Sequence, residues 1–171
     1  DNNLANVARE ERYDKLEAFI NDHLTARYDL VVMDLPGKED NIALNGLLAA
    51  ENTIAPLKPG EFERQQLEQL RDDLEEYRED YDDVDPRLAL VFATMVDQRT
   101  KLSEQFVGDL EDEYPDVSGT YVGSTQNIGT GQDEGKTLFA YEDDELYTSG
   151  QRARDAYRAN TEQLLDEIDP R

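Results

Sequence analysis

The first residue whose position suggests chemistry is Asp34, which closes the apolar run YDLVVMD at residues 28–34 and is followed by Leu35-Pro36-Gly37. A continuous apolar run bounded by a turn predicts a strand buried on both faces. A carboxylate at the end of such a strand can hold the Mg²⁺ of a nucleoside triphosphate, often through a water, while the next turn senses the γ-phosphate. An Asp in this place is also a common helix cap or turn residue, so spacing alone leaves both roles open.

A second polar segment, Thr94-Met95-Val96-Asp97-Gln98-Arg99-Thr100, follows another apolar run. Its polar side chains could form the edge of a base pocket, and Arg99 could reach a phosphate or a partner. The alternative is a helix cap followed by an exposed arginine, and the spacing favours neither interpretation.

A third candidate, residues 129–137 (GTGQDEGKT), contains a Gly-Lys-Thr triplet. It fails as a phosphate-binding P-loop, because G-x-x-x-x-G-K-[ST] requires glycine at position 130, where Thr130 stands. Two acidic residues inside the segment would also repel phosphate. The Gly-, Ser-, Thr- and Gln-rich composition instead predicts a flexible surface loop over residues 123–137.

The fourth candidate is a cationic cluster of Arg152, Arg154 and Arg158 near the start of the last predicted helix. These side chains could contact DNA phosphates. They could as readily pair with neighbouring carboxylates such as Asp155 and Glu162, which is our default expectation.

Composition restricts the class of protein. The 171 residues include 41 Asp and Glu against 17 Lys and Arg, for a formal net charge of −24. Among the basic residues 12 are Arg and 5 are Lys, and the apolar pattern is normal. Many carboxylates with few lysines indicate a cytoplasmic protein adapted to molar salt. At such salt the Debye length falls to about 3 Å, so the repulsion between surface carboxylates is screened. An acidic interaction domain is the alternative. The chain has no cysteine, which excludes a disulfide framework, a thiolate zinc site and a Cys nucleophile. It has one histidine, His23, which cannot by itself form a His-rich metal site.

Periodicity and turn signals predict an α/β fold in one domain, residues 1–171, with a parallel sheet covered by helices on both faces. The expected helices cover 9–25, 41–50, 61–79, 100–113 and 149–168, and the expected strands cover 28–34, 53–57, 88–95 and 120–123. Ligands of parallel α/β sheets bind outside the carboxyl ends of the strands. The functional residues should therefore lie within 34–40, 58–61, 95–101 and 123–127.

Several segments, taken in order, resemble the ParA (Soj) family of partition ATPases, in the deviant-Walker ParA/MinD group of P-loop NTPases. YDLVVMDLPG is similar to the Walker B and switch II region of that family, and NIALNGLLAAENTIAPLKPGEFERQQLEQL to the stretch after it. LALVFATMVDQRTKLSEQFV, EGKTLFAYEDDE and GQRARDAYRANTEQLL resemble the later segments. The resemblance covers the C-terminal two-thirds of such an ATPase.

The resemblance implies a role for particular residues. Asp34 would be the catalytic Walker B aspartate near Mg²⁺, and Pro36 and Gly37 would belong to switch II at the nucleotide. Thr94, Met95 and the 123–127 loop, including Asn127, would lie on the adenine side of the pocket. The implied cofactors are ATP and Mg²⁺, and the implied partners are a second copy of the protein, DNA and an activating ParB-like protein, with no membrane.

The sequence departs from the family pattern at several points. The deviant Walker A segment K-G-G-x-G-K-[ST] is not found in these 171 residues, so we expect no ATPase activity from this chain alone. The "NVR" of the family reads Asn127-Ile128-Gly129 here, and Pro36-Gly37 stands where many members have Pro-Pro. The chain is expected to be a fragment of a longer ATPase; the alternative is a short, non-enzymatic ParA-like interaction module. A membrane-cycling MinD-like protein is less favoured, because the ending LLDEIDPR is acidic.

Overall fold

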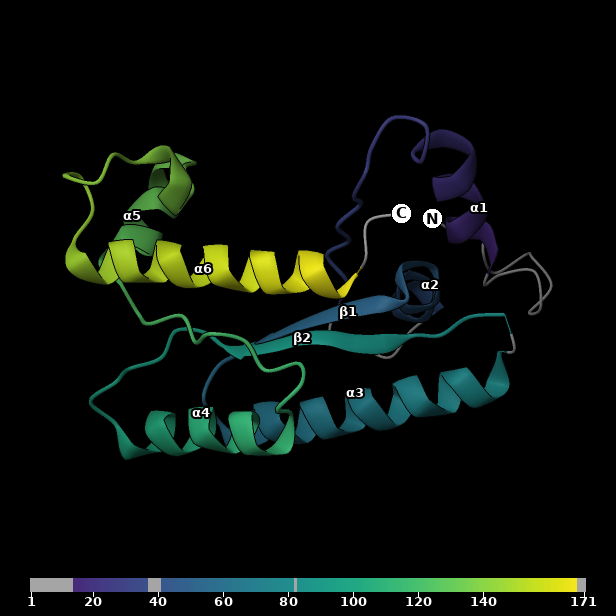
Figure 1. Ribbon diagram of the computed structural model, residues 1–171, viewed down its shortest axis with the longest axis horizontal. Helices are drawn as coiled ribbons and strands as arrows, with labels where there is room; N and C mark the ends of the chain where they lie inside the picture. The colour runs from purple at the N-terminus through teal and green to yellow at the C-terminus, as the bar shows by residue number, and fades with distance from the viewer. Residues whose placement is uncertain (1–13, 37–40, 82, 169–171) are drawn as a thin grey trace. The chain divides into compact units, whose positions relative to one another are not determined.

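The computed structural model describes residues 14–36, 41–81 and 83–168, and its elements are shown in Figure 1. The described residues divide into two compact units, one made of those within 14–53 and 71–87 and the other of those within 54–70 and 88–168. The elements in chain order are α1 (Asp14–His23), α2 (Asn41–Ala50), β1 (Asn52–Leu57), α3 (Glu61–Asp80), β2 (Arg87–Ala93), α4 (Lys101–Glu113), α5 (Gln126–Glu134), the 3₁₀ turn η3 (Leu138–Ala140) and α6 (Thr148–Glu167).

The two strands β1 and β2 pair in parallel. The N–H of Arg87 donates to the carbonyl of Glu51 at 2.6 Å, and the N–H of Thr94 donates to the carbonyl of Leu57 at 2.7 Å, so both strands run in the same direction. On the other side of β2, the expected fourth strand is an extended segment with two isolated parallel bridges, Val91 to Ser118 and Val96 to Gly123. The predicted parallel α/β arrangement is thus present in the described residues as two strands and one strand-like segment.

In the second unit, helices cover both faces of β2, as predicted. Successive strand residues point to opposite faces, so Val91 and Ala93 share one face and Leu90 and Phe92 share the other. The first face packs against side chains of α3 and α4, in a cluster of Ala55, Leu67, Val91, Ala93, Val96, Phe106, Leu110 and Tyr114. The second face packs against α6 and the segment before it, in a cluster of Leu90, Phe92, Val122, Leu138, Leu146, Ala153 and Ala156.

The segment over residues 28–36 differs from its prediction as a buried strand. It forms no β-ladder with any other part of the chain that the structure describes. Leu30 is 48 % exposed and Val32 is 76 % exposed. The prediction is wrong here because an apolar run becomes a buried strand only where neighbouring strands hydrogen-bond to its backbone.

Residues 123–137 also differ from their prediction as a loop, because they contain helix α5. The Oγ1 of Thr125 accepts a hydrogen bond from the N–H of Asn127 at 3.3 Å and caps the start of the helix. The helix ends at Gly135, whose φ of 66° is the left-handed conformation that glycine adopts without strain. A Cβ at Gly131 would lie 2.6 Å from the carbonyl oxygen of Lys136, so the chain can reverse closely only over a glycine.

The remaining boundaries agree closely with the sequence. Helix α2 covers 41–50 as predicted, and α3, α4 and α6 each begin and end within one residue of the expected positions. Helix α1 occupies the second part of the predicted 9–25 helix, whose first five residues, 9–13, lie outside the described ones. His23 is exposed at the end of α1, where its ring centroid lies 4.8 Å from that of Phe19.

Candidate functional site

Three of the four segments predicted to carry function meet at the carboxyl end of the strands in the second unit. The hydrogen bond from Thr94 to Leu57 joins the end of β2 to the turn that holds residues 58–61. The N–H of Val96 donates to the carbonyl of Val122 at 3.1 Å, and the N–H of Ser124 donates to the carbonyl of Val96 at 2.9 Å. These bonds bring residues 95–101 beside residues 123–127, which is where parallel α/β proteins bind ligands.

Met95, at this edge, has a left-handed backbone conformation that is uncommon for a residue other than glycine. Its φ is 55°, in the left-handed region that a residue with a side chain occupies at a cost of about 1 kcal/mol. Val96 beside it is buried, whereas the Met95 side chain is 54 % exposed. The buried Val96 therefore anchors the turn, and the turn holds the apolar side chain of Met95 in solvent. Left-handed backbone at a residue with a side chain is often found at ligand-binding sites.

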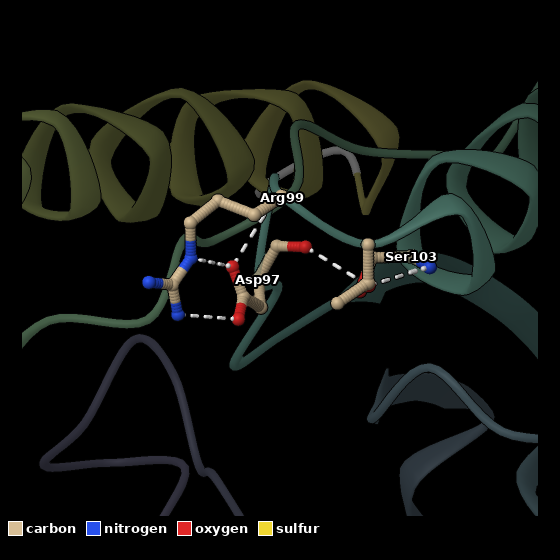
Figure 2. Close-up of polar contacts among 4 residues, drawn as sticks. Asp97, Arg99 and Ser103 are labelled. Atoms are coloured by element: carbon tan, nitrogen blue, oxygen red, sulfur yellow. Dashed lines mark hydrogen bonds and ion pairs between the residues drawn. The ribbon is translucent and has the colours of Figure 1, made fainter.

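The loop after Met95 is held by a clamp between Asp97 and Arg99 (Figure 2). The Nε and Nη2 of Arg99 donate to the two carboxylate oxygens of Asp97 at 2.9 and 2.8 Å, and the Arg99 backbone N–H donates at 3.1 Å. These hydrogen bonds lower the pKa of Asp97 to about 2. Thr100 then caps α4, because its Oγ1 accepts from the N–H of Ser103 at 3.3 Å. The helix-cap interpretation of this segment is thus confirmed for Thr100.

Asn127 lies at the junction of two helix starts. Its side chain is buried, and its Oδ1 accepts a hydrogen bond from the N–H of Tyr147, the residue that precedes α6, at 3.0 Å. The Oγ1 of Thr125 lies 3.0 Å from the Oγ of Ser149, in the first turn of α6. The carboxamide oxygen of Asn127 therefore fixes the start of α6 relative to α5, which sequence reasoning did not foresee. The threonine before α5 was the sequence signal that a capped helix begins there.

Asp34 and Pro36 lie in the first unit, in the segment over residues 28–36, and both are exposed. Gly37 lies outside the described residues. Beside Asp34, Leu35 packs on Gly46 of α2, where a Cβ would lie 3.1 Å from Cγ of the leucine. No group of three His, Cys, Asp or Glu residues in the described ranges is placed to hold a metal ion. An exposed carboxylate such as Asp34 suits a Mg²⁺ that keeps most of its waters.

The arginine cluster on α6 is largely engaged with the protein itself. Arg154 is 14 % exposed at its side chain, donates to the carbonyl of Tyr141 at 3.2 Å and forms an ion pair with Asp143. Arg158 contacts Asp155 at 3.3 Å, and its guanidinium lies 5.9 Å from the ring centroid of Phe139. The default expectation of carboxylate pairing is confirmed for these two arginines, although Asp143 was not foreseen as a partner. Arg152 is exposed.

Comparisons with known proteins found similarity in both sequence and structure. The Chromosome-partitioning ATPase Soj of Thermus thermophilus is 31 % identical over 114 residues, which is 65 % of this chain and 45 % of Soj. A solved structure titled Partition Protein matches with a TM-score of 0.60 and 19 % identity, over 89 % of this chain and 41 % of that one. No protein-family profile matches the chain.

The α/β fold is thus similar to that of a partition protein, and the sequence shows distant homology to the chromosome-partitioning ATPase Soj over part of its length. It spans less than half the length of either protein. The helices of the described residues include none that is long and apolar enough to cross a membrane.

Proposed function

We propose that this chain is part of a cytoplasmic partition ATPase in which ATP binding drives dimerisation and non-specific DNA binding. A ParB-like partner would stimulate hydrolysis and so reverse both. The observation that carries the proposal is the 114-residue relationship to a chromosome-partitioning ATPase. The strand-end arrangement of residues 94–97 and 123–127 supports it, because these segments meet where α/β proteins bind nucleotides.

In this proposal Asp34 holds Mg²⁺ through a water, and Pro36 and Gly37 form the switch that responds to the γ-phosphate. Bound Mg²⁺ offsets the negative charge of the phosphates during hydrolysis. The exposed carboxylate of Asp34 is compatible with this role. Because the 171 residues contain no Walker A lysine, we expect this chain alone not to turn over ATP.

Thr94, Met95 and Asn127 would form the adenine side of the pocket. The exposed Met95 side chain offers an apolar surface on which a base can pack. The Asn127 carboxamide oxygen already accepts from Tyr147, so we assign Asn127 the task of holding the α5–α6 junction that shapes the pocket. For DNA, Arg152 and Arg158 are better placed than Arg154, whose guanidinium is mostly covered.

The test uses the protein as it occurs in its own cell, together with any sequence that precedes Asp1 in its reading frame. We expect Asp34→Ala to lower ATP turnover by at least about 100-fold, since each tenfold loss corresponds to about 1.4 kcal/mol of transition-state stabilisation. Asp29→Ala is the matched control, because Asp29 is an exposed carboxylate in the same segment. Equal turnover in the two variants would remove Asp34 from catalysis.

A second function, that of a non-enzymatic interaction module, is the alternative. Size-exclusion chromatography of the native-cell protein in molar KCl, with and without ATP and Mg²⁺, separates the two. A nucleotide-dependent dimer supports the ATPase, and an oligomeric state that ignores nucleotide supports the interaction module. Molar KCl is the appropriate medium because the net charge of −24 is screened there.

A further inference from the structure

The strand-like segment over residues 117–123 is the outermost one beside β2 among the described residues, and α6 and the end of α4 supply hydrogen-bond partners on its outer side. Its inner side faces β2. The N–H of Val91 donates to the carbonyl of Val117 at 2.9 Å, and the N–H of Gly119 donates to the carbonyl of Val91 at 2.8 Å. Since neighbouring residues of a strand direct their backbone groups to opposite sides, the groups of Ser118 and Thr120 face outward.

Three of these outward groups have partners on α6 and at the end of α4. The N–H of Ser118 donates to the carbonyl of Tyr114 at 2.8 Å. The carbonyl of Ser118 accepts from Nε2 of Gln163 at 3.2 Å, and the carbonyl of Thr120 accepts from Nδ2 of Asn160 at 2.8 Å. Two side-chain carboxamides thus take the acceptors that another strand would use.

The packing around Asn160 shows how closely this contact is built. Asn160 is 3 % exposed, and its Oδ1 has no hydrogen-bond partner in the described residues. A Cβ at Gly119 would lie 2.6 Å from that Oδ1 and 2.9 Å from Cδ1 of Leu90, so only glycine lets the carboxamide approach the strand. A buried oxygen without a partner carries a desolvation penalty, which an apolar side chain would avoid.

One stripe of α6, formed by Ala153, Ala156, Asn160 and Gln163, changes from apolar to polar along the helix. Ala153 and Ala156 are buried in the apolar cluster against β2. Asn160 and Gln163 continue this stripe at helical spacing, but they are polar where the stripe meets the edge of the sheet. The change from apolar to carboxamide side chains coincides with the outward-facing carbonyls of Ser118 and Thr120.

We propose that Asn160 and Gln163 cap this edge of the sheet and prevent the 117–123 segment from pairing with the same segment of a second copy. An open strand edge is a template for such pairing. Repulsion between highly charged chains would also oppose it at low salt, but this repulsion is screened in molar salt. The carboxamides protect the edge independently of salt and independently of the proposed ATPase function.

The test compares the full chain with Asn160→Ala/Gln163→Ala in molar KCl. The probe is a synthetic peptide of residues 117–123, and its binding is followed by fluorescence anisotropy, with light scattering for self-association. We expect the double variant to bind the peptide at least about tenfold more tightly than wild type and to self-associate in a way that the peptide inhibits. Gln151→Ala is the matched control, because it removes a carboxamide of α6 that donates to a backbone carbonyl, that of Asp143 at 2.7 Å, away from the sheet.

A single Gln163→Ala variant is tested beside the double one, because Asn160 is deeply buried and its loss could unfold the chain. Gln163 is only half-buried, and circular dichroism establishes that the variant is folded. Peptide binding by folded Gln163→Ala above that of wild type supports the proposal. Binding equal to wild type, or self-association that the peptide does not inhibit, overturns it.

Discussion

Replacing Gly150 by alanine should destabilise this protein, although alanine is the better helix former. Gly150 lies in the first turn of α6, and its Cα approaches the buried side chain of Asn127. A Cβ at position 150 would lie 2.9 Å from Cγ and 3.2 Å from Cβ of Asn127, and closer still to its Oδ1. The carboxamide would have to move away and release the N–H of Tyr147, to which it is bound at 3.0 Å.

The opposing terms have comparable sizes. Alanine gains about 1 kcal/mol over glycine in a helix. Inserting a methyl group into a packed site costs about 1–3 kcal/mol, and losing the hydrogen bond between Asn127 and Tyr147 costs about 1 kcal/mol more. We therefore expect Gly150→Ala to lower the free energy of unfolding by about 1–3 kcal/mol. For a chain of this size that corresponds to a fall in Tm of about 2–12 °C.

Two glycines inside other helices provide matched controls. A Cβ at Gly108 in α4 or at Gly129 in α5 would meet nothing within 4 Å. Gly108→Ala and Gly129→Ala should therefore show the helix-propensity gain alone, up to about 1 kcal/mol of added stability. Chemical denaturation followed by circular dichroism measures all three variants under one condition.

A double-mutant cycle tests the physical cause. Asn127→Ala removes the obstructing side chain, so Gly150→Ala should be neutral or slightly stabilising in that background. The coupling energy between the two substitutions is then about 1–4 kcal/mol. Additive effects, or a Gly150→Ala variant as stable as Gly108→Ala, would show that the contact between these two residues does not govern stability.

Three further predictions follow from the backbone and the ion pairs. Glu51 follows α2 with a φ of 55°, so Glu51→Gly should raise the free energy of unfolding by up to about 1 kcal/mol in chemical denaturation. Carboxyl NMR should show Asp97 titrating near pH 2, and Arg99→Ala should return its pKa towards about 3.9. Since the pKa of Asp97 is lowered in the folded state, its contacts with Arg99 stabilise the fold above about pH 4. This stabilisation is lost as the pH falls towards 2. Arg64 is 23 % exposed and binds two carboxylates of α4, so Arg64→Met should lower the free energy of unfolding by about 1–2 kcal/mol. The control Arg71→Met, at an exposed ion pair, should lower it by less than about 0.5 kcal/mol in the same denaturation assay.

Local signals in the sequence were sufficient for most helices and for the paired strands. The apolar spacing of α3 and the short apolar runs of β1 and β2 specify these elements through interactions between near neighbours. The cap at Thr100 is equally local, because its hydroxyl binds the N–H three residues later. The relationship to partition ATPases is likewise carried by ordered sequence segments.

The candidate site was predictable only in outline. Parallel strands must end at a common edge, so the meeting of residues 95–101 with residues 123–127 followed from the α/β pattern. The left-handed turn at Met95 and the tie from Asn127 to Tyr147 depend on which chain segments lie beside them. No spacing rule relates residues that interact across 20 positions of sequence.

Tertiary structure alone decided two other features. Residues 28–34 have the composition of a buried strand, yet a strand exists only where another chain segment satisfies its backbone, and none in the described residues does so. Arg154 is covered because the fold brings Asp143 and the Tyr141 carbonyl to it. Both outcomes depend on which distant segments become neighbours when the chain folds, whereas sequence patterns report the interactions along a single helix or strand.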